Sequence, residues 1–187
     1  MKKDIENIFQ ESIEVKQDTL LANADAIVTV VKEVTKALKK KNKVMFFGNG
    51  GSAADSQHIA AEFIGRFQKE RKALPAMALT TDSSILTALA NDYSVDIIFS
   101  RQIEGLGKKG DIAFGISTSG NSSNVVEGIK QAKKMGIKTV VLTGGAGGKL
   151  AKLADISLIV PSTKTARIQE SHICIAHAIC ELVEKQF

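Results

Sequence analysis

The sequence has 187 residues, of which 44% are hydrophobic and 24% charged, and it contains only two prolines. This length and composition indicate one globular domain with a sizeable core, and they exclude collagen-like, low-complexity and intrinsically disordered chains. The formal net charge of +5 is a mild excess that favours an anionic ligand without requiring a nucleic acid.

The start of the chain and its two cysteines indicate the compartment. Residues Met1–Glu6 lack the apolar run of a signal peptide, and no stretch approaches the roughly 18 apolar residues of a membrane span. Cys174 and Cys180 are six residues apart in one predicted helix, about 9 Å along its axis, which argues against a mutual disulfide. We therefore expect a reduced, soluble, cytoplasmic protein with no membrane partner.

The N-terminal segment is predicted to form two helices. No glycine or proline occurs between Ile5 and Lys41, and apolar residues recur at helical spacing on both sides of a break placed at Asn23–Asp25. The basic run Lys39–Lys41 suits a helix C-terminus, and no aromatic residues interleave with it to stack bases. We expect residues 1–42 to be a helical extension used in oligomer contacts.

After residue 42, short apolar runs alternate with helical stretches, which is typical of a parallel sheet covered on both faces. The sequence predicts an α/β fold, a three-layer αβα sandwich with a five-stranded parallel sheet at residues 43–187, and one domain over residues 1–187. The predicted strands are 44–47, 76–79, 112–116, 139–142 and 156–160. The predicted helices are 52–67, 83–90, 95–106, 122–135, 149–153 and 166–184.

The loop after the first strand, Gly48–Asp55, is rich in glycine. Glycines allow a sharp turn and a close approach to a ligand, and the following helix offers free N–H groups. The same residues also fit a loose dinucleotide fingerprint or a purely structural turn. The dinucleotide interpretation lacks the acidic residue that should close the next strand, because Glu70 lies in a charged turn ahead of it.

The loop after the third strand, Ser117–Ser123, is the better candidate for binding a phosphate group. Hydroxyls, a glycine and a helix start coincide there, and such a loop offers many donors without a lysine or a metal. A helix cap needs only one hydroxyl, so the surplus favours phosphate over simple capping. The third glycine-rich turn, Thr143–Gly148, is interpreted as a chain reversal.

Acid/base and metal-binding side chains lie on two predicted helices. His58 and Glu62 are four residues apart and share one helix face, which suits a metal pair or an acid/base pair. Gln169 and His177 share one side of the last helix but are about 12 Å apart along its axis. Each histidine taken alone is more often structural. The apolar neighbours of Glu62 should partly desolvate its carboxylate, as suits a general base.

Together these motifs resemble the sugar isomerase (SIS) family and, within it, the bacterial phosphoheptose isomerases. The resemblance covers nearly the whole chain. Its glycine and serine loops mark only the SIS fold, which non-catalytic sugar-phosphate sensors share, whereas His58, Glu62, Gln169 and His177 are specific to the enzymes. The residues that carry the resemblance are Asn49–Ser52, Gln57, His58, Glu62, Asn91, Asp92, Ser117–Ser122 and Ala166–Glu170.

The resemblance implies an aldose–ketose isomerase that converts sedoheptulose 7-phosphate to D-glycero-D-manno-heptose 7-phosphate, the first step of heptose biosynthesis for lipopolysaccharide or other surface glycans. It also implies a cytoplasmic homotetramer with active sites at subunit interfaces. One zinc ion per subunit is implied at His58, Glu62, Gln169 and His177. Substrate contacts are implied for Asn49, Gly50, Gly51, Ser52, Glu62, Asn91, Asp92, Ser117, Thr118, Ser119, Ser122 and Gln169.

Moving a carbonyl between C1 and C2 of a sugar requires a base at carbon and a group that stabilises charge on oxygen. We assign Glu62 as the base and His177 as the partner acid or base, working through an enediol(ate). Two questions stay open: whether these residues also bind the metal tightly, and whether one or several subunits supply the ligands. The rival hypotheses are a non-catalytic SIS-fold regulator and a nucleotide-dependent enzyme.

Overall fold

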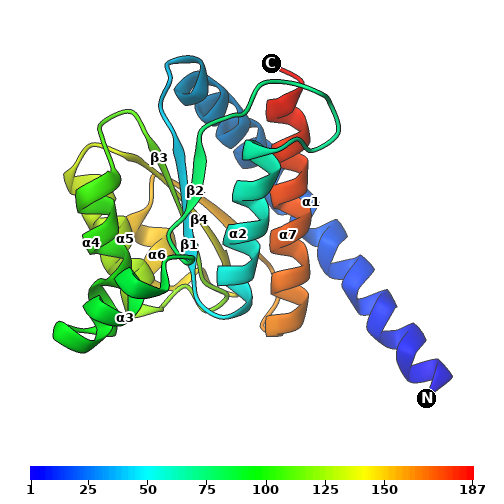
Figure 1. The fold of residues 1–187 in the computed structure, drawn as a ribbon. Helices are drawn as coiled ribbons and strands as arrows, with labels where there is room; N and C mark the ends of the chain where they lie inside the picture. Colours follow the sequence, from blue (N-terminus) through cyan, green and yellow to red (C-terminus); the bar gives the residue numbers. More distant parts are fainter.

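Five parallel strands form one sheet at the centre of the fold, as predicted (Figure 1). The computed structural model describes the whole chain, Met1–Phe187. The strand order is β2-β1-β3-β4-β5, so the chain reverses its direction of travel across the sheet after β2. The strands are β1 (Val44–Gly48), β2 (Ala76–Ala78), β3 (Ile112–Ile116), β4 (Lys138–Gly144) and β5 (Ile156–Val160).

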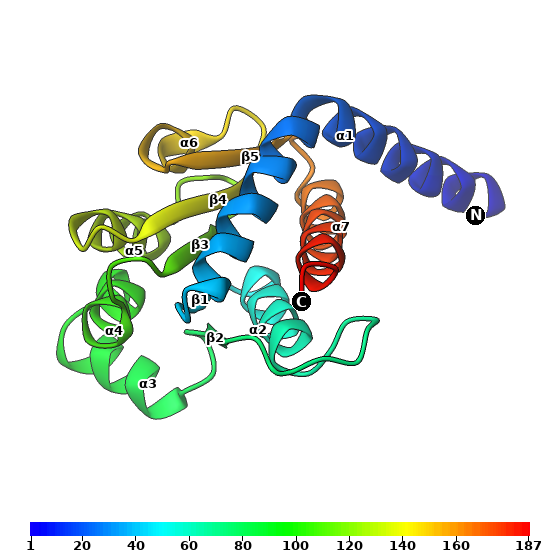
Figure 2. The same ribbon diagram turned by 90° about the horizontal axis from the view of Figure 1, so that it is seen from above.

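Helices cover both faces of the sheet, which makes the predicted three layers (Figure 2). None of these helices combines the length and apolarity that crossing a membrane requires. Most predicted helices agree with the structure to within a few residues, although the first stretch is one helix and α2 stops before residue 67. The helices are α1 (Lys2–Lys39), α2 (Gly51–Ile64), α3 (Ser83–Asp92), the 3-10 turn η1 (Val95–Ile97), α4 (Ile98–Leu106), α5 (Ser123–Lys134), α6 (Gly148–Leu153) and α7 (Thr165–Glu184).

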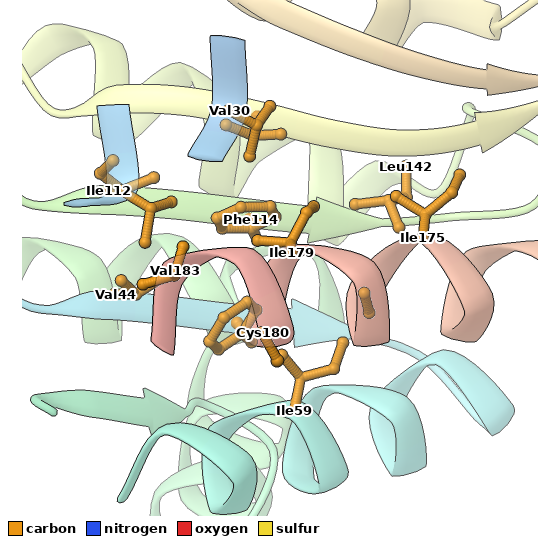
Figure 3. Close-up of a cluster of buried hydrophobic side chains, with 14 of the residues drawn as sticks. Val30, Val44, Ile59, Ile112, Phe114, Leu142, Ile175, Ile179, Cys180 and Val183 are labelled. Atoms are coloured by element: carbon orange, nitrogen blue, oxygen red, sulfur yellow. The ribbon is translucent and has the colours of Figure 1, made fainter. Parts of the chain in front are cut away.

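The two faces of the sheet bury two separate cores. Side chains point alternately up and down along a strand, so Phe46 and Phe47 enter different cores. Phe46 joins the larger core beneath α1, α2 and α7, part of which is drawn in Figure 3. Phe47 packs against Phe99 of α4 in the smaller core, which α5 completes. Every residue of β1 is buried because both of its faces are covered, which explains the continuous apolar run.

The prediction of two N-terminal helices is wrong, because α1 is a single helix of 38 residues. Asn23, placed at the predicted break, is 4% exposed and faces the outer strand β5. Its side-chain amide donates to the carbonyl of Ile159 (3.0 Å), and its oxygen accepts from the N–H of Ile159 (2.9 Å). The side chain thus provides hydrogen-bond partners for the backbone N–H and carbonyl of Ile159 on an edge strand. This contact outweighs the weak helix propensity of asparagine.

Candidate active site

The glycine and serine loops lie side by side at the carboxyl edge of the sheet. They follow the neighbouring parallel strands β1 and β3, whose register aligns Gly48 with Ile116. The side-chain amides of Asn49 and Asn124 join the two loops through a reciprocal pair of hydrogen bonds of 2.8 and 2.9 Å. The loops therefore form one continuous polar rim where parallel sheets bind ligands.

The serine loop gathers hydroxyls at the start of α5. Ser117 Oγ lies 2.9 Å from Ser122 Oγ and 3.4 Å from Ser119 Oγ. Ser122 stands at the N-cap position, yet its side chain caps no backbone N–H group. The hydroxyls, together with the free N–H groups of a 12-residue helix, form a cradle of hydrogen-bond donors whose chemistry suits an anion.

His58, Glu62 and His177 form a compact cluster between α2 and α7, two helices that lie side by side in Figures 1 and 2. The Nε2 atoms of His58 and His177 are 3.0 Å apart, and His58 Nε2 is 3.2 Å from Glu62 Oε1. The possible ligand atoms of all three residues lie within 4.8 Å of one another. The Glu62 side chain is 23% exposed, so its carboxylate is partly desolvated while still open to a ligand.

Comparison with known proteins agrees with this arrangement. A family model described as the SIS domain matches residues 8–144. The phosphoheptose isomerase of Aquifex aeolicus is 56% identical over 185 residues, which cover 99% of this chain and 97% of that protein. The chain belongs to the phosphoheptose isomerase family.

Two solved structures of this family have the same fold over their full length. The phosphoheptose isomerase of Neisseria gonorrhoeae has a TM-score of 0.93 and 43% sequence identity, covering 98% of both chains. That of Francisella tularensis has a TM-score of 0.94 and 37% identity, covering 98% of this chain and 97% of its own. At this coverage, the similarity includes the N-terminal helix as well as the sheet.

Gln169 extends from α7 to the start of α2. A Cβ atom added to Gly51 would lie 1.8 Å from Gln169 Nε2, so any larger residue there would displace this side chain. The glycine loop thus approaches a protein side chain closely, whereas its predicted close approach to a ligand stays a prediction. Gly51 faces Gln169 and His58 faces His177, and these two pairings show that α2 and α7 run parallel. Gln169 and His177, which are about two turns apart on α7, therefore each contact a different part of α2 in the same chain.

Asp55 is a site residue that the sequence analysis left without a role. Its carboxyl lies beside the amide of Gln169 and near both histidines, and one oxygen is buried without a hydrogen-bond partner. Burial raises the pKa of this carboxyl, although the bond from Gln169 and the nearby histidines oppose the rise. The spacing of Asp55 in the sequence could have revealed this role. Asp55 lies three residues before His58 and seven before Glu62, on the same face of α2.

Asn91 and Asp92 are not joined to the cluster. Both are exposed in the last turn of α3, where the Asn91 amide donates to the Asp92 carboxylate (2.8 Å). The following turn η1 is tied to the serine loop by a hydrogen bond from Ser123 Oγ to Asp96. No hydrogen bond connects Asn91 or Asp92 to His58, Glu62 or His177 within the chain.

The remaining histidine and the cysteines are outside the site. His172 is 1% exposed, its Nε2 donates to the Thr143 carbonyl at 3.0 Å, and burial lowers its pKa to about 4. This is the structural role expected of a lone helical histidine. Cys174 and Cys180 are both free, as the helical spacing predicted, and burial raises the pKa of the Cys180 thiol to about 12.

Proposed function

We propose that this protein is a phosphoheptose isomerase that interconverts sedoheptulose 7-phosphate and D-glycero-D-manno-heptose 7-phosphate and so supplies heptose for surface glycans. The observation that carries the proposal is the meeting of Glu62 and His177 between α2 and α7, in the same chain as the serine cradle. A sugar-phosphate sensor needs the cradle but not a carboxylate beside two imidazoles. The enzyme is therefore favoured over a non-catalytic regulator.

In this mechanism the cradle binds the substrate phosphate. The hydroxyls of Ser117, Thr118, Ser119 and Ser122 and the N-terminus of α5 neutralise its charge. The glycine loop, Asn49–Ser52, lies next to the cradle and contacts the sugar chain, as does Gln169 beside it. This arrangement fixes the orientation of the substrate, so that its reacting carbons lie toward α2 and α7.

The carboxylate of Glu62 removes a proton from C1 of the ketose. His177 donates a proton to the carbonyl oxygen at C2 as negative charge develops there, which gives the enediol(ate). Glu62 then returns its proton to C2, and His177 accepts the proton from the C1 hydroxyl. The products are the C1 aldehyde and the C2 alcohol, so protons and electrons balance with no external reductant.

The residues of the cluster fit a zinc ion. Zinc prefers imidazole nitrogen and carboxylate oxygen, and the possible ligand atoms of His58, Glu62 and His177 lie within 4.8 Å of one another. We propose that His58, Glu62 and His177 would hold the ion with Gln169 as a further ligand, one ion per subunit, and that Glu62 and His177 would leave the ion when substrate arrives, which frees them to carry protons. Bound there, zinc would act as a Lewis acid toward the oxygens of the sugar.

We further propose a cytoplasmic homotetramer with shared active sites. The first half of α1 projects from the body of the protein, and its apolar side chains are exposed (Figure 1). We also propose that Asn91 and Asp92, which are not joined to the cluster of their own chain, contribute to a neighbouring subunit's site. The exposed side chains are Ile5, Ile8, Phe9 and Ile13, spaced along one side of the helix.

The test is turnover of sedoheptulose 7-phosphate in deuterated water. Proton transfer through an enediol(ate) places deuterium at C2 of the aldose product. The variant Glu62→Gln keeps the shape of the side chain but loses the base, so we expect turnover to fall by about 100-fold to 10,000-fold with substrate binding retained. The matched control is Glu104→Gln, which removes an exposed carboxylate of α4 that pairs only with Arg101.

Two outcomes would contradict the proposal. An active Glu62→Gln variant would refute the assignment of the base. Tight binding of the sugar phosphate by the unaltered protein, without any turnover, would instead identify a regulator that uses the same cradle.

A further inference from the structure

A buried ion pair lies behind the active site, at the C-terminal ends of α2 and α7. Arg71 Nε is 3.3 Å from Glu184 Oε1, and the two side chains are only 4% and 3% exposed. Removing two charges from water is costly, so a buried pair is rarely explained by stability alone. Neither residue belongs to the predicted site, and the proposed chemistry uses neither of them.

Glu184 holds the loop that follows α2. Its carboxylate accepts hydrogen bonds from the backbone N–H groups of Phe67 (2.9 Å), Gln68 (2.7 Å) and Lys69 (2.8 Å). Burial by itself raises the pKa of Glu184, but these bonds and the charge of Arg71 outweigh it, and the net pKa lies below the ordinary value. The carboxylate is therefore charged and binds one tight turn of backbone.

Arg71 holds the last turn of α2. Its Nη1 donates to the carbonyls of Phe63 (2.8 Å), Gly65 (3.0 Å) and Lys72 (3.1 Å), and its Nη2 donates to the carbonyl of Glu62 (2.8 Å). Carbonyls at a helix C-terminus lack partners within the helix, and a cation satisfies them. The guanidinium group therefore fixes the main chain of Glu62 itself, and it also explains why α2 ends before residue 67.

The turn held by Glu184 carries Phe67 to the ring of His177. The two ring centroids are 5.3 Å apart with an interplanar angle of 37°. The ring of His58 is the other aromatic neighbour of His177, at 5.1 Å and 47°. The imidazole of His177 thus has its orientation limited by ring contacts from α2 and from the loop that follows it.

We propose that Phe67, Arg71 and Glu184, here called the clamp, are positioning residues that set the relative placement of Glu62 and His177. The proposal rests on the proposed function, because it assigns the reaction to those two groups. Within the clamp, Arg71 donates a hydrogen bond to the backbone carbonyl of Glu62, and the ring of Phe67 lies against the imidazole of His177. The clamp touches no part of the cradle, so it should affect the chemical step rather than phosphate binding.

The experiment compares substitutions of Phe67 with a matched control in the full-length enzyme. Phe67→Leu removes the ring but keeps an apolar side chain, and Phe67→Tyr keeps the ring. We expect kcat for sedoheptulose 7-phosphate to fall roughly 10-fold to 100-fold in Phe67→Leu with KM changed less than twofold, and Phe67→Tyr to restore it. The control Phe99→Leu removes a buried ring from the opposite core, and it should lower thermal stability without changing kcat.

A spectroscopic measurement separates positioning from general destabilisation. The chain has only three histidines, so imidazole labelling yields three assignable NMR signals. Glu184→Gln removes the charge that holds the turn, and we expect it to shift the signal of His177, as Phe67→Leu does, while the signal of buried His172 stays in place. The same variant should lower kcat with little change in KM.

Three results would overturn the clamp. Wild-type kcat in Phe67→Leu, beside an inactive Glu62→Gln, refutes the clamp and leaves the proposed function intact. An equal loss of kcat in Phe99→Leu shows that the effect is loss of stability. An active Glu62→Gln removes the proposed function, and the clamp falls with it.

Discussion

Acid should destabilise this protein through His172, a residue far from the chemistry. The imidazole is 1% exposed, its Nδ1 has no hydrogen-bond partner, and burial lowers its pKa to about 4. In the unfolded chain the pKa of histidine is about 6.5. Between these two values the unfolded state binds a proton that the folded state does not, so stability falls as the pH falls from about 6.5 towards 4.

The magnitude follows from the two pKa values. At pH 5 the unfolded state gains about 2 kcal/mol relative to the folded state, and at pH 7.5 the contribution is close to zero. We expect His172→Gln, whose amide can still donate to the Thr143 carbonyl, to lose this dependence. The free energy of unfolding should therefore drop by about 2 kcal/mol more in the wild type than in the variant between pH 7.5 and pH 5.

The assay is equilibrium urea unfolding of both proteins at the two pH values, with protein and metal concentrations held constant. Carboxylates whose folded pKa is lowered, such as Asp155 and Glu184, also weaken the fold in acid, because their contribution is lost as the pH falls. They are present in both proteins and cancel in the comparison. An equal drop in wild type and variant would refute the reasoning, since it would mean that His172 is protonated in the folded protein.

Three further predictions test other contacts. Gly51→Ala places a methyl group where the Gln169 amide lies, so kcat/KM should fall about tenfold or more in a steady-state assay. Asn23→Ala removes two hydrogen bonds to β5 and should lower the free energy of unfolding by about 2 kcal/mol in a urea titration. Phe9→Glu adds a charge to the exposed face of α1 and should shift the proposed tetramer towards smaller species in light scattering.

Each of these has a matched control. Gly105→Ala has open space around the added methyl group, and equal losses at positions 51 and 105 would show that Gln169 is not the cause. Asn7 lies exposed on the same helix, so Asn7→Ala should leave stability unchanged and Asn7→Glu should leave the assembly intact. A tetramer that survives Phe9→Glu would contradict the role given to that face.

Local patterns in the chain were enough to predict the sheet and the loops that follow its strands. Apolar runs such as 112–116 are buried on both faces, and burial on both faces is what makes a run continuous. The surplus of hydroxyls at Ser117–Ser123 likewise marked the cradle, since capping alone would not use them. Residue types within a few positions of one another contain this information.

The pattern failed where a long-range contact outweighs a local preference. The local sequence at Asn23 predicts a helix break. In the structure, both hydrogen-bonding groups of its side chain instead bond to β5, which lies 136 residues further along the chain. The end of α2 was misplaced for the same reason, because the residue that holds the following loop is Glu184 on α7. Neither partner can be inferred from the sequence around the element that it changes.

The candidate site combines both kinds of information. Spacing alone places His58 and Glu62 on one face of a helix that starts at the carboxyl edge of the sheet. The contact between His58 and His177 joins residues 119 positions apart, and it exists because α2 and α7 pack side by side in parallel over the same core. Periodicity along the chain specifies which face of a helix is polar. Only the packing of the folded chain specifies which neighbouring helix that face contacts.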